Sequence, residues 1–214
     1  MGKEGLNDYV QRGYLPSDFG GEVVSRTLDY GFADWSTARA LLVLADKADK
    51  EGTGGGAEMR TQAKTLMSRA TNAYTQLFDK GRGLMVPKNR NGEFSPSFNS
   101  IEWGNGYTEG NSWHHSFPPY AIVPSVDLSS NLRGGAEQPG GLVTLYGGAA
   151  ALLARLHKLL KIPSNFRTGS YGQEIHEMTE ARAVAMGQYG HNNQPSHHIL
   201  YLFAVLGKAV EISR

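Results

Sequence analysis

The sequence predicts an all-α fold of about five or six helices joined by long loops. Apolar residues recur at steps of three and four along most of the chain, which places them on one face of successive helices. No stretch competes with this through the two-residue alternation that is typical of β-strands. Long polar segments rich in glycine separate the helical stretches. This alternation suits an α/α barrel with a site built from loops at one rim, and a helical bundle or solenoid is the alternative.

The first two helical stretches form a predicted hairpin. The apolar positions of the first are Val24, Leu28, Phe32, Trp35, Ala38 and Leu42. The glycine-rich segment 52–56 then breaks the pattern with a turn. The apolar positions of the second are Met59, Ala63, Leu66, Ala70, Ala73 and Leu77, and the pattern ends near Gly81.

Residues 81–106 show no period, and the sequence predicts one long loop there. A loop of this length inside a domain is commonly functional or disordered, and its aromatic residues Phe94, Phe98 and Trp103 favour an ordered, functional loop. A short helix is expected to start near Thr108 and to stop before Pro118.

The last part of the chain predicts three more helices after a polar connection over residues 125–140. The strongest covers residues 142–160, with Leu142, Leu145, Ala149, Leu152, Leu153, Leu156 and Leu160 on its inner face. A shorter one covers residues 174–186. The last begins at Pro195, since proline suits the first helical turn, and Gly207 suits its end.

Composition excludes several classes of function. The chain has 214 residues, the size of one domain, and a net charge of only +1 without a basic block, so we expect no nucleic-acid partner. No apolar run approaches the roughly 18–20 residues that cross a bilayer, so we expect no membrane partner. The chain has no cysteine, which excludes disulfides and thiolate metal sites. Residues 1–5 contain no apolar signal region, and the sequence does not indicate the cellular compartment of the protein.

Three segments concentrate polar and aromatic residues where a loop meets a helix, namely residues 25–35, 107–115 and 187–198. Each residue in them has a structural explanation such as capping, pairing or core packing. Together they resemble a sugar site, because aromatic rings stack on sugar faces while amides and carboxylates bind hydroxyls. A carboxyl held against apolar rings has a raised pKa and can act as an acid. Glu109, close to Trp113, fits that role.

The same segments resemble glycoside hydrolase family 92. The run Tyr-Thr-Glu-Gly-Asn-Ser-Trp at 107–113 is similar to a hallmark of the family, and residues 25–35 are similar to an earlier helix motif. Pro-Ser-His-His at 195–198 resembles a third motif, and residues 169–179 resemble the segment that joins them. Their order agrees with the family, and together they span nearly the whole chain.

This resemblance implies a calcium-dependent exo-α-mannosidase that acts on terminal α-1,2-linked mannose with inversion. Residues 1–214 would be one piece of the catalytic domain, a partial (α/α)6 barrel whose general acid is Glu109. The expected partner is a mannose-containing glycan. The substrate-binding residues implied are Tyr107, Asn111, Trp113, His114, His197 and His198. Family members are often secreted or periplasmic.

The chain departs from the family pattern at two points. The acidic, glycine-rich motif that carries the catalytic base is not present, so we expect this chain alone to be inactive or weakly active. The missing barrel segments, or self-association, would be needed to cover exposed apolar helix faces. Gln194 stands where family members commonly have a calcium-associated glutamate, and its neutral amide would weaken calcium binding.

Two other functions remain open from the sequence. A non-catalytic mannose-binding or scaffold protein would keep the fold and lack the base. A zinc hydrolase would use the seven histidines. The run His176-Glu177-Met178-Thr179-Glu180 resembles the zinc helix His-Glu-x-x-His but has Glu180 in place of its second histidine.

Overall fold

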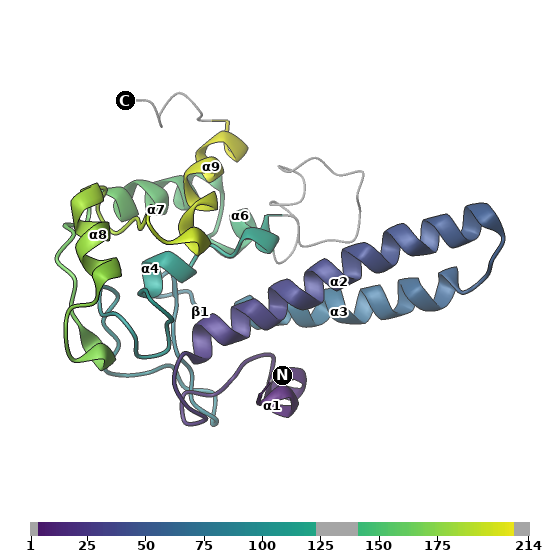
Figure 1. The fold of residues 1–214 in the computed structure, drawn as a ribbon, viewed down its shortest axis with the longest axis horizontal. Helices are drawn as coiled ribbons and strands as arrows, with labels where there is room; N and C mark the ends of the chain where they lie inside the picture. Colours follow the sequence, from purple (N-terminus) through teal and green to yellow (C-terminus); the bar gives the residue numbers. More distant parts are fainter. Residues whose placement is uncertain (1–3, 123–140, 208–214) are drawn as a thin grey trace.

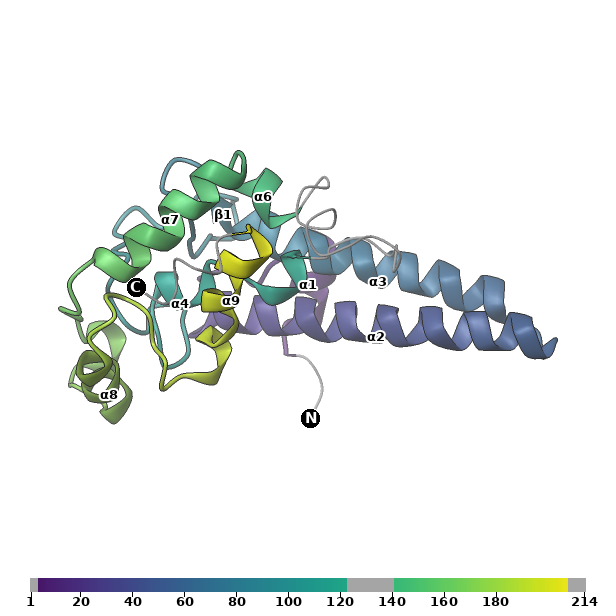
Figure 2. The same ribbon diagram turned by 90° about the horizontal axis from the view of Figure 1, so that it is seen from above.

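A long helical hairpin dominates the structure, a computed structural model that describes residues 4–122 and 141–207. Helices α2 (Val23–Glu51) and α3 (Gly56–Leu77) pack along each other and project from the rest of the molecule (Figures 1 and 2). α2 ends at Gly52, whose left-handed backbone (φ 67°) lets its N–H bond to the carbonyl of Ala48. The predicted hairpin and its glycine turn are therefore confirmed.

The predicted stripe of α2 is confirmed at Val24, Leu28 and Ala38, which are buried, and differs at Phe32. Beyond Leu28, the buried residues of α2 are small or polar, namely Gly31, Asp34, Ala38, Ala45 and Ala48. A Cβ on Gly31 would lie 3.0 Å from the Cβ of Ala73 on α3, so the two backbones approach closely there. Phe32 is 47% exposed and stacks on Trp35. The prediction that Phe32 is buried was wrong because close helix contact favours small side chains over bulky ones.

Short elements surround the base of the hairpin. α1 (Leu6–Arg12) precedes it, and the two-residue strands β1 (Phe78–Asp79) and β2 (Leu84–Met85) follow as an antiparallel pair in which Phe78 faces Met85. The sequence predicted neither α1 nor this pair. Two isolated bridges also involve the predicted long loop, one between Lys88 and Phe94 and one between Glu102 and Arg167. The all-α class is confirmed, since these strands are the exception within the described residues.

After the loop come α4 (Ser112–His115) and the 3₁₀ turn η1 (Pro119–Ala121). The expected connection at 125–140 lies outside the described residues. The helix predicted over 142–160 is two helices, α6 (Leu142–Leu145) and α7 (Ala149–Lys161). Gly147 and Gly148 separate them with positive φ angles of 84° and 123°, a conformation that a helix cannot contain.

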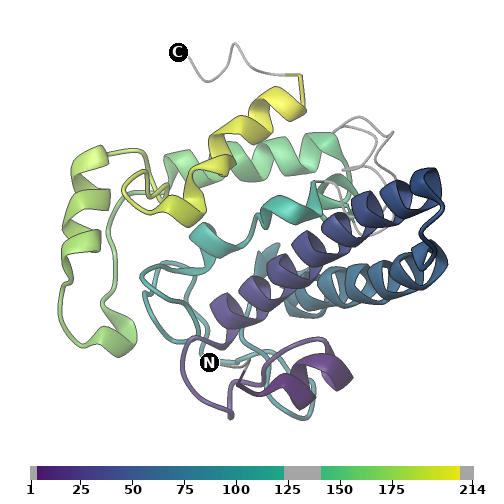
Figure 3. The same cartoon turned by 45° about the vertical axis from the view of Figure 1, so that its right-hand side comes forward.

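Four short elements follow α7 in the described part of the chain. η2 (Gly169–Tyr171) and α8 (His176–Val184) come first, followed by η3 (Gln194–Ser196) and α9 (His198–Val205). α9 lies beside α7 (Figure 3), with the His157 and Phe203 rings edge to face at 5.2 Å. The last helix thus begins three residues after Pro195, which lies in the preceding 3₁₀ turn.

One large core joins these elements. It includes Leu15, Val24, Tyr74, Leu77, Met85, Trp113, Phe117, Leu142, Leu156, Ile199 and Leu202. A smaller cluster of Trp103, Met178 and Ala181 attaches α8. Several apolar side chains stay exposed, among them Val43 (58%), Leu44 (51%) and Tyr201 (72%). No helix in the described part of the chain is both long and apolar enough to span a membrane.

Candidate active site

Glu109 lies in the loop just before α4, and its side chain is exposed. Its backbone is left-handed, with φ 44°. For a residue with a Cβ this conformation costs about 1–2 kcal/mol, so the surroundings must hold it in place. The sequence led us to expect a helix start near Thr108 and apolar rings against Glu109. Both expectations were wrong, because α4 begins at Ser112 and the Glu109 side chain is exposed.

Two side chains from distant parts of the chain hold the Glu109 backbone. The N–H of Glu109 donates to the hydroxyl of Tyr171 at 2.8 Å, and the carbonyl of Glu109 accepts from Nδ2 of Asn193 at 2.8 Å. The N–H belongs to the peptide plane before the Cα and the carbonyl to the plane after it. Since φ and ψ are the rotations of these two planes, the pair of hydrogen bonds fixes both angles. We call Tyr171 and Asn193 the Glu109 clamp.

The neighbouring residue, Thr108, is tied to the start of α2. Its N–H donates to Oγ of Ser25 at 2.9 Å, and Nε2 of His115 lies 3.3 Å from both Oγ of Ser25 and the carbonyl of Thr108. The His115 ring also stacks on Tyr107 at 5.5 Å. Burial lowers the pKa of His115 to about 4, so the ring is neutral at pH 7. The three segments singled out in the sequence therefore meet around Glu109.

Four of the expected substrate-binding residues lie in the interior, beneath the Glu109 loop. Tyr107, Asn111, Trp113 and His114 are each at most 2% exposed. The hydroxyl of Tyr107 donates to the carbonyl of Met85 at 2.6 Å. Asn111 caps α4, since its Oδ1 accepts from the N–H of Trp113 at 2.9 Å. Direct contact with a sugar needs an exposed face, so in this structure these side chains support the loop from below.

Trp113 is the clearest case. Its ring belongs to the large core, and the guanidinium of Arg155 lies 5.3 Å from its centroid. A ring enclosed in this way has no free face for a sugar to stack on. Its sugar-stacking role stays a prediction, and its position favours a role in packing.

His114 is held as one neutral tautomer. Its Nδ1 accepts from the N–H of Asn111 at 3.2 Å, so the proton is on Nε2. Burial, with a smaller contribution from His115, lowers the pKa of His114 to about 3. Nε2 of His114 and Oδ1 of Asn192 are buried without a hydrogen-bond partner in the described chain. Both face Gly190, where a Cβ would lie 3.2 Å and 3.7 Å from them, respectively.

The third segment places its expected residues around the turn before α9. Gln194 is exposed. His197 is also exposed, and its Nε2 donates to the carbonyl of His191 at 2.6 Å while the two rings stack. His198 is half-buried, and its Nε2 donates to the carbonyl of Phe117. Burial lowers the pKa of His198, against an opposing effect of that hydrogen bond.

The described residues supply only part of what a calcium ion requires. Calcium takes six to eight oxygen ligands, with carboxylates prominent among them. Among its neutral amide oxygens, this segment offers the unpartnered Oδ1 of Asn192 and the side-chain oxygen of the exposed Gln194. Across the described ranges, no three histidine or acidic side chains gather in a way that could hold a metal ion. The same observation gives the zinc alternative no support.

The sequence singled out neither member of the clamp as a site residue. Asn193 was noted only for its place in the third segment, and Tyr171 only as part of a joining segment. The positive φ of Glu109 is the signal that reveals them, and it is visible only in the structure. A second buried pair was missed in the same way, since Nδ2 of Asn111 donates to Oε1 of Gln188 at 2.8 Å across 77 residues.

Comparisons with known proteins agree on one family. The model of the glycosyl hydrolase family 92 catalytic domain matches residues 1–212. The family GH92 inverting mannosidase BT2199 from Bacteroides thetaiotaomicron VPI-5482 is 33% identical, with a TM-score of 0.60 over 94% of this chain and 23% of that one. No curated protein matches.

A second solved relative is the family GH92 α-mannosidase BT3965 from Bacteroides thetaiotaomicron. It is 22% identical, with a TM-score of 0.64 over 97% of this chain and 21% of that one. Its complex with mannoimidazole gives a TM-score of 0.66 over 97% and 23% of the respective chains. This chain thus spans less than a quarter of the length of these relatives, and its helical fold agrees with the expected partial barrel. The chain belongs to glycosyl hydrolase family 92.

Proposed function

We propose that the protein is an exo-acting, inverting α-mannosidase that removes terminal α-1,2-linked mannose, with Glu109 as its general acid. One observation carries the assignment of the acid. Glu109 is an exposed carboxyl on a strained backbone that two distant side chains hold in place. Such strain persists where the surroundings over-determine it, and functional sites are where it concentrates. Family membership supplies the reaction class.

In this reaction Glu109 donates its proton to the glycosidic oxygen as the bond to the mannose breaks. The clamp fixes the Cα of Glu109 and the direction in which its side chain leaves the backbone. The clamp therefore restricts the orientations of the carboxyl relative to the glycosidic oxygen. Such positioning of a catalytic group contributes a large share of the rate enhancement of an enzyme. An inverting enzyme also needs a second carboxylate about 6.5–9.5 Å away, which activates water on the opposite face of the sugar. We assign no base among the described residues.

Calcium dependence is part of this proposal and rests on the family resemblance. Asn192 and Gln194 are the residues that would contribute oxygen ligands, with the remaining ligands coming from outside the described residues. The ion would bind the mannose 2- and 3-hydroxyls and favour a distorted ring. With only neutral amides from this segment, its affinity is expected to be weak.

The test is hydrolysis of α-1,2-mannobiose by the whole protein, with calcium and with a chelator. Glu109→Gln should lower kcat at least 100-fold, in line with the usual contribution of a general acid. Glu58→Gln, an exposed carboxyl on α3, is the matched control and should leave kcat unchanged. Proton NMR of the first product should show β-mannose, which reports inversion.

Full turnover in Glu109→Gln would remove Glu109 from the acid role. Binding of mannobiose without turnover by the unaltered protein would instead favour the non-catalytic carbohydrate-binding function. Undiminished activity in the chelator would remove calcium from the proposal.

A further inference from the structure

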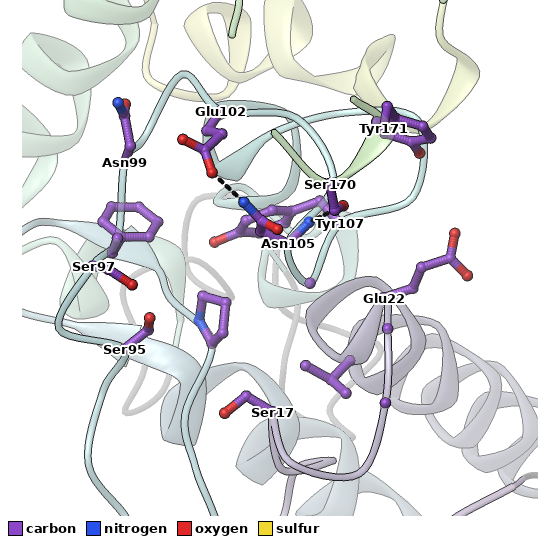
Figure 4. A pocket seen from close by; sticks show the side chains of 17 residues that line it. Ser17, Glu22, Ser95, Ser97, Asn99, Glu102, Asn105, Tyr107, Ser170 and Tyr171 are labelled. Atoms are coloured by element: carbon purple, nitrogen blue, oxygen red, sulfur yellow. Dashed lines mark hydrogen bonds between the residues drawn. The ribbon is translucent and has the colours of Figure 1, made fainter. Parts of the chain in front are cut away.

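A cavity of about 750 Å³ opens beside the Glu109 loop (Figure 4). Its walls come from three parts of the chain, namely residues 17–23 before and at the start of α2, residues 87–107 of the long loop, and Ser170 with Tyr171 in η2. This volume lies in the range of small-molecule sites. Tyr171 links the cavity to Glu109, since its side chain lines the cavity and its hydroxyl accepts the Glu109 N–H.

The backbone around the cavity is strained in the same way as at Glu109. Four non-glycine residues in the described ranges have positive φ, and two of them, Glu22 (φ 59°) and Asn105 (φ 50°), line the cavity. The N–H of Asn105 is held by Oγ of Ser170 at 2.8 Å, and its side chain bonds to Glu102. Close packing also shapes this wall, because a Cβ on Gly104 would lie 2.1 Å from Oγ of Ser170. The wall is therefore built to a fixed shape by contacts between distant segments.

The polar part of the lining is uncharged except for carboxylates. Hydroxyl and amide groups come from Ser17, Ser95, Ser97, Asn99, Asn105 and Ser170. The first three hydroxyls make no hydrogen bond within the described part of the chain, so they are available to a ligand. Glu22 and Glu102 are the charged groups among the described lining residues, which include no lysine, arginine or histidine.

This chemistry selects among ligands. Two carboxylates in a lining without cationic side chains among the described residues disfavour phosphate, sulfate and acidic sugars. Carboxylates, amides and hydroxyls together supply both acceptors and donors, which is what a polyhydroxylated neutral molecule requires. Val23, Pro87 and Phe98 add apolar surface for the C–H face of a ring. A neutral hexose matches this lining.

We propose that this cavity is a distal glycan subsite, which binds a neutral sugar unit beyond the one attached to the scissile oxygen. This inference rests on the proposed function, because the subsite would bind the leaving glycan, which lies on the same side as the proposed general acid Glu109. Glu109 itself does not line the cavity, and Tyr171 stands between them. A disaccharide engaged at Glu109 would therefore leave the cavity empty, whereas a longer glycan reaches it.

Binding measured by calorimetry in the whole protein tests this inference. A Glu109→Gln background prevents turnover, and the ligands are α-1,2-mannobiose and linear α-1,2-mannotetraose. Gly20→Trp places a bulky ring at the cavity wall, where the backbone accepts a side chain because Gly20 lacks a positive φ and has nothing within 4 Å of an added Cβ. Ser97→Trp places such a ring at a second wall, and Gln11→Trp on the exposed face of α1 is the matched control.

Either cavity variant should weaken mannotetraose binding at least tenfold and change mannobiose binding less than twofold. The control should change neither. Equal loss for both ligands, no loss in either cavity variant, or no mannotetraose binding by the parent would overturn the inference. Failure of the proposed function is distinguishable, because it would show as full mannobiose turnover in Glu109→Gln, whether or not Gly20→Trp weakens mannotetraose binding.

Discussion

Removing the Asn193 half of the Glu109 clamp should misplace the acid without unfolding the protein. Asn193→Ala deletes the 2.8 Å hydrogen bond to the Glu109 carbonyl. One such bond contributes about 1 kcal/mol, similar to the cost of about 1–2 kcal/mol of a left-handed residue. Its loss should lower the equilibrium constant between the clamped and the released conformation about fivefold, since 1.4 kcal/mol is a factor of ten. With Tyr171→Phe added, about 2 kcal/mol is lost and the expected factor is about 30.

The assay compares leaving groups of different acidity. Departure of a dinitrophenolate needs little protonation, whereas departure of an unactivated sugar alcohol depends on the general acid. Asn193→Ala should therefore lower kcat two- to fivefold on α-1,2-mannobiose, in proportion to the clamped fraction, and leave kcat on 2,4-dinitrophenyl α-mannoside unchanged. KM should change little for either substrate, because the variant alters the position of the acid and removes no substrate contact.

Asn165→Ala is the matched control, since Asn165 is an exposed amide for which the described structure has no hydrogen bond. It should leave both substrates unaffected. Equal losses of kcat on the two substrates would refute the positioning argument, because a general loss of structure would not distinguish leaving groups. An unchanged kcat on mannobiose would refute the clamp itself.

Two predictions concern the interior beneath the Glu109 loop. Trp113→Ala should lower the free energy of unfolding by about 3–5 kcal/mol in urea denaturation, because the ring is 2% exposed; unchanged stability with weaker mannose binding would make it a stacking surface after all. The pKa of His114 is about 3 in the folded protein, against about 6.5 when unfolded. Between these two pH values the unfolded chain binds more protons than the folded protein, so the free energy of unfolding falls as the pH drops below 6.5. Between pH 7 and 5 this loss should be on the order of 2 kcal/mol. His114→Asn should lack it, and equal pH dependence of the urea midpoints in both proteins would contradict the neutral, buried assignment.

The sequence predicted the elements whose stability is local. α2 and α3 follow from periodic apolar residues and the glycine turn between them, and their pairing needs no information from elsewhere. The break between α6 and α7 was missed because a continuous apolar pattern runs across it, and only the positive φ of Gly147 and Gly148 shows that the helix stops. α1 was missed because it is seven residues long and buries only Tyr9.

The sequence identified the segments that form the candidate site, but it did not predict how their side chains are arranged. Polar and aromatic composition marked the segments that meet at Glu109. Composition could not reveal that Trp113 and His114 face the core while Glu109 faces solvent, since all three lie within six residues. The clamp was also beyond reach, because its partners are 62 and 84 residues from Glu109.

The spacing of the clamp has a consequence for the order of events during synthesis. A ribosome adding about 5–20 residues per second makes residue 193 roughly 4–17 s after residue 109, because 84 residues separate them. The α2–α3 hairpin, whose contacts are local, can form within that interval, since helix pairing is far faster. Until residue 171 has been made, the Glu109 loop has neither Tyr171 nor Asn193 to bind its backbone. The nascent chain thus carries the carboxyl of the proposed acid for seconds before the backbone that aims it can settle.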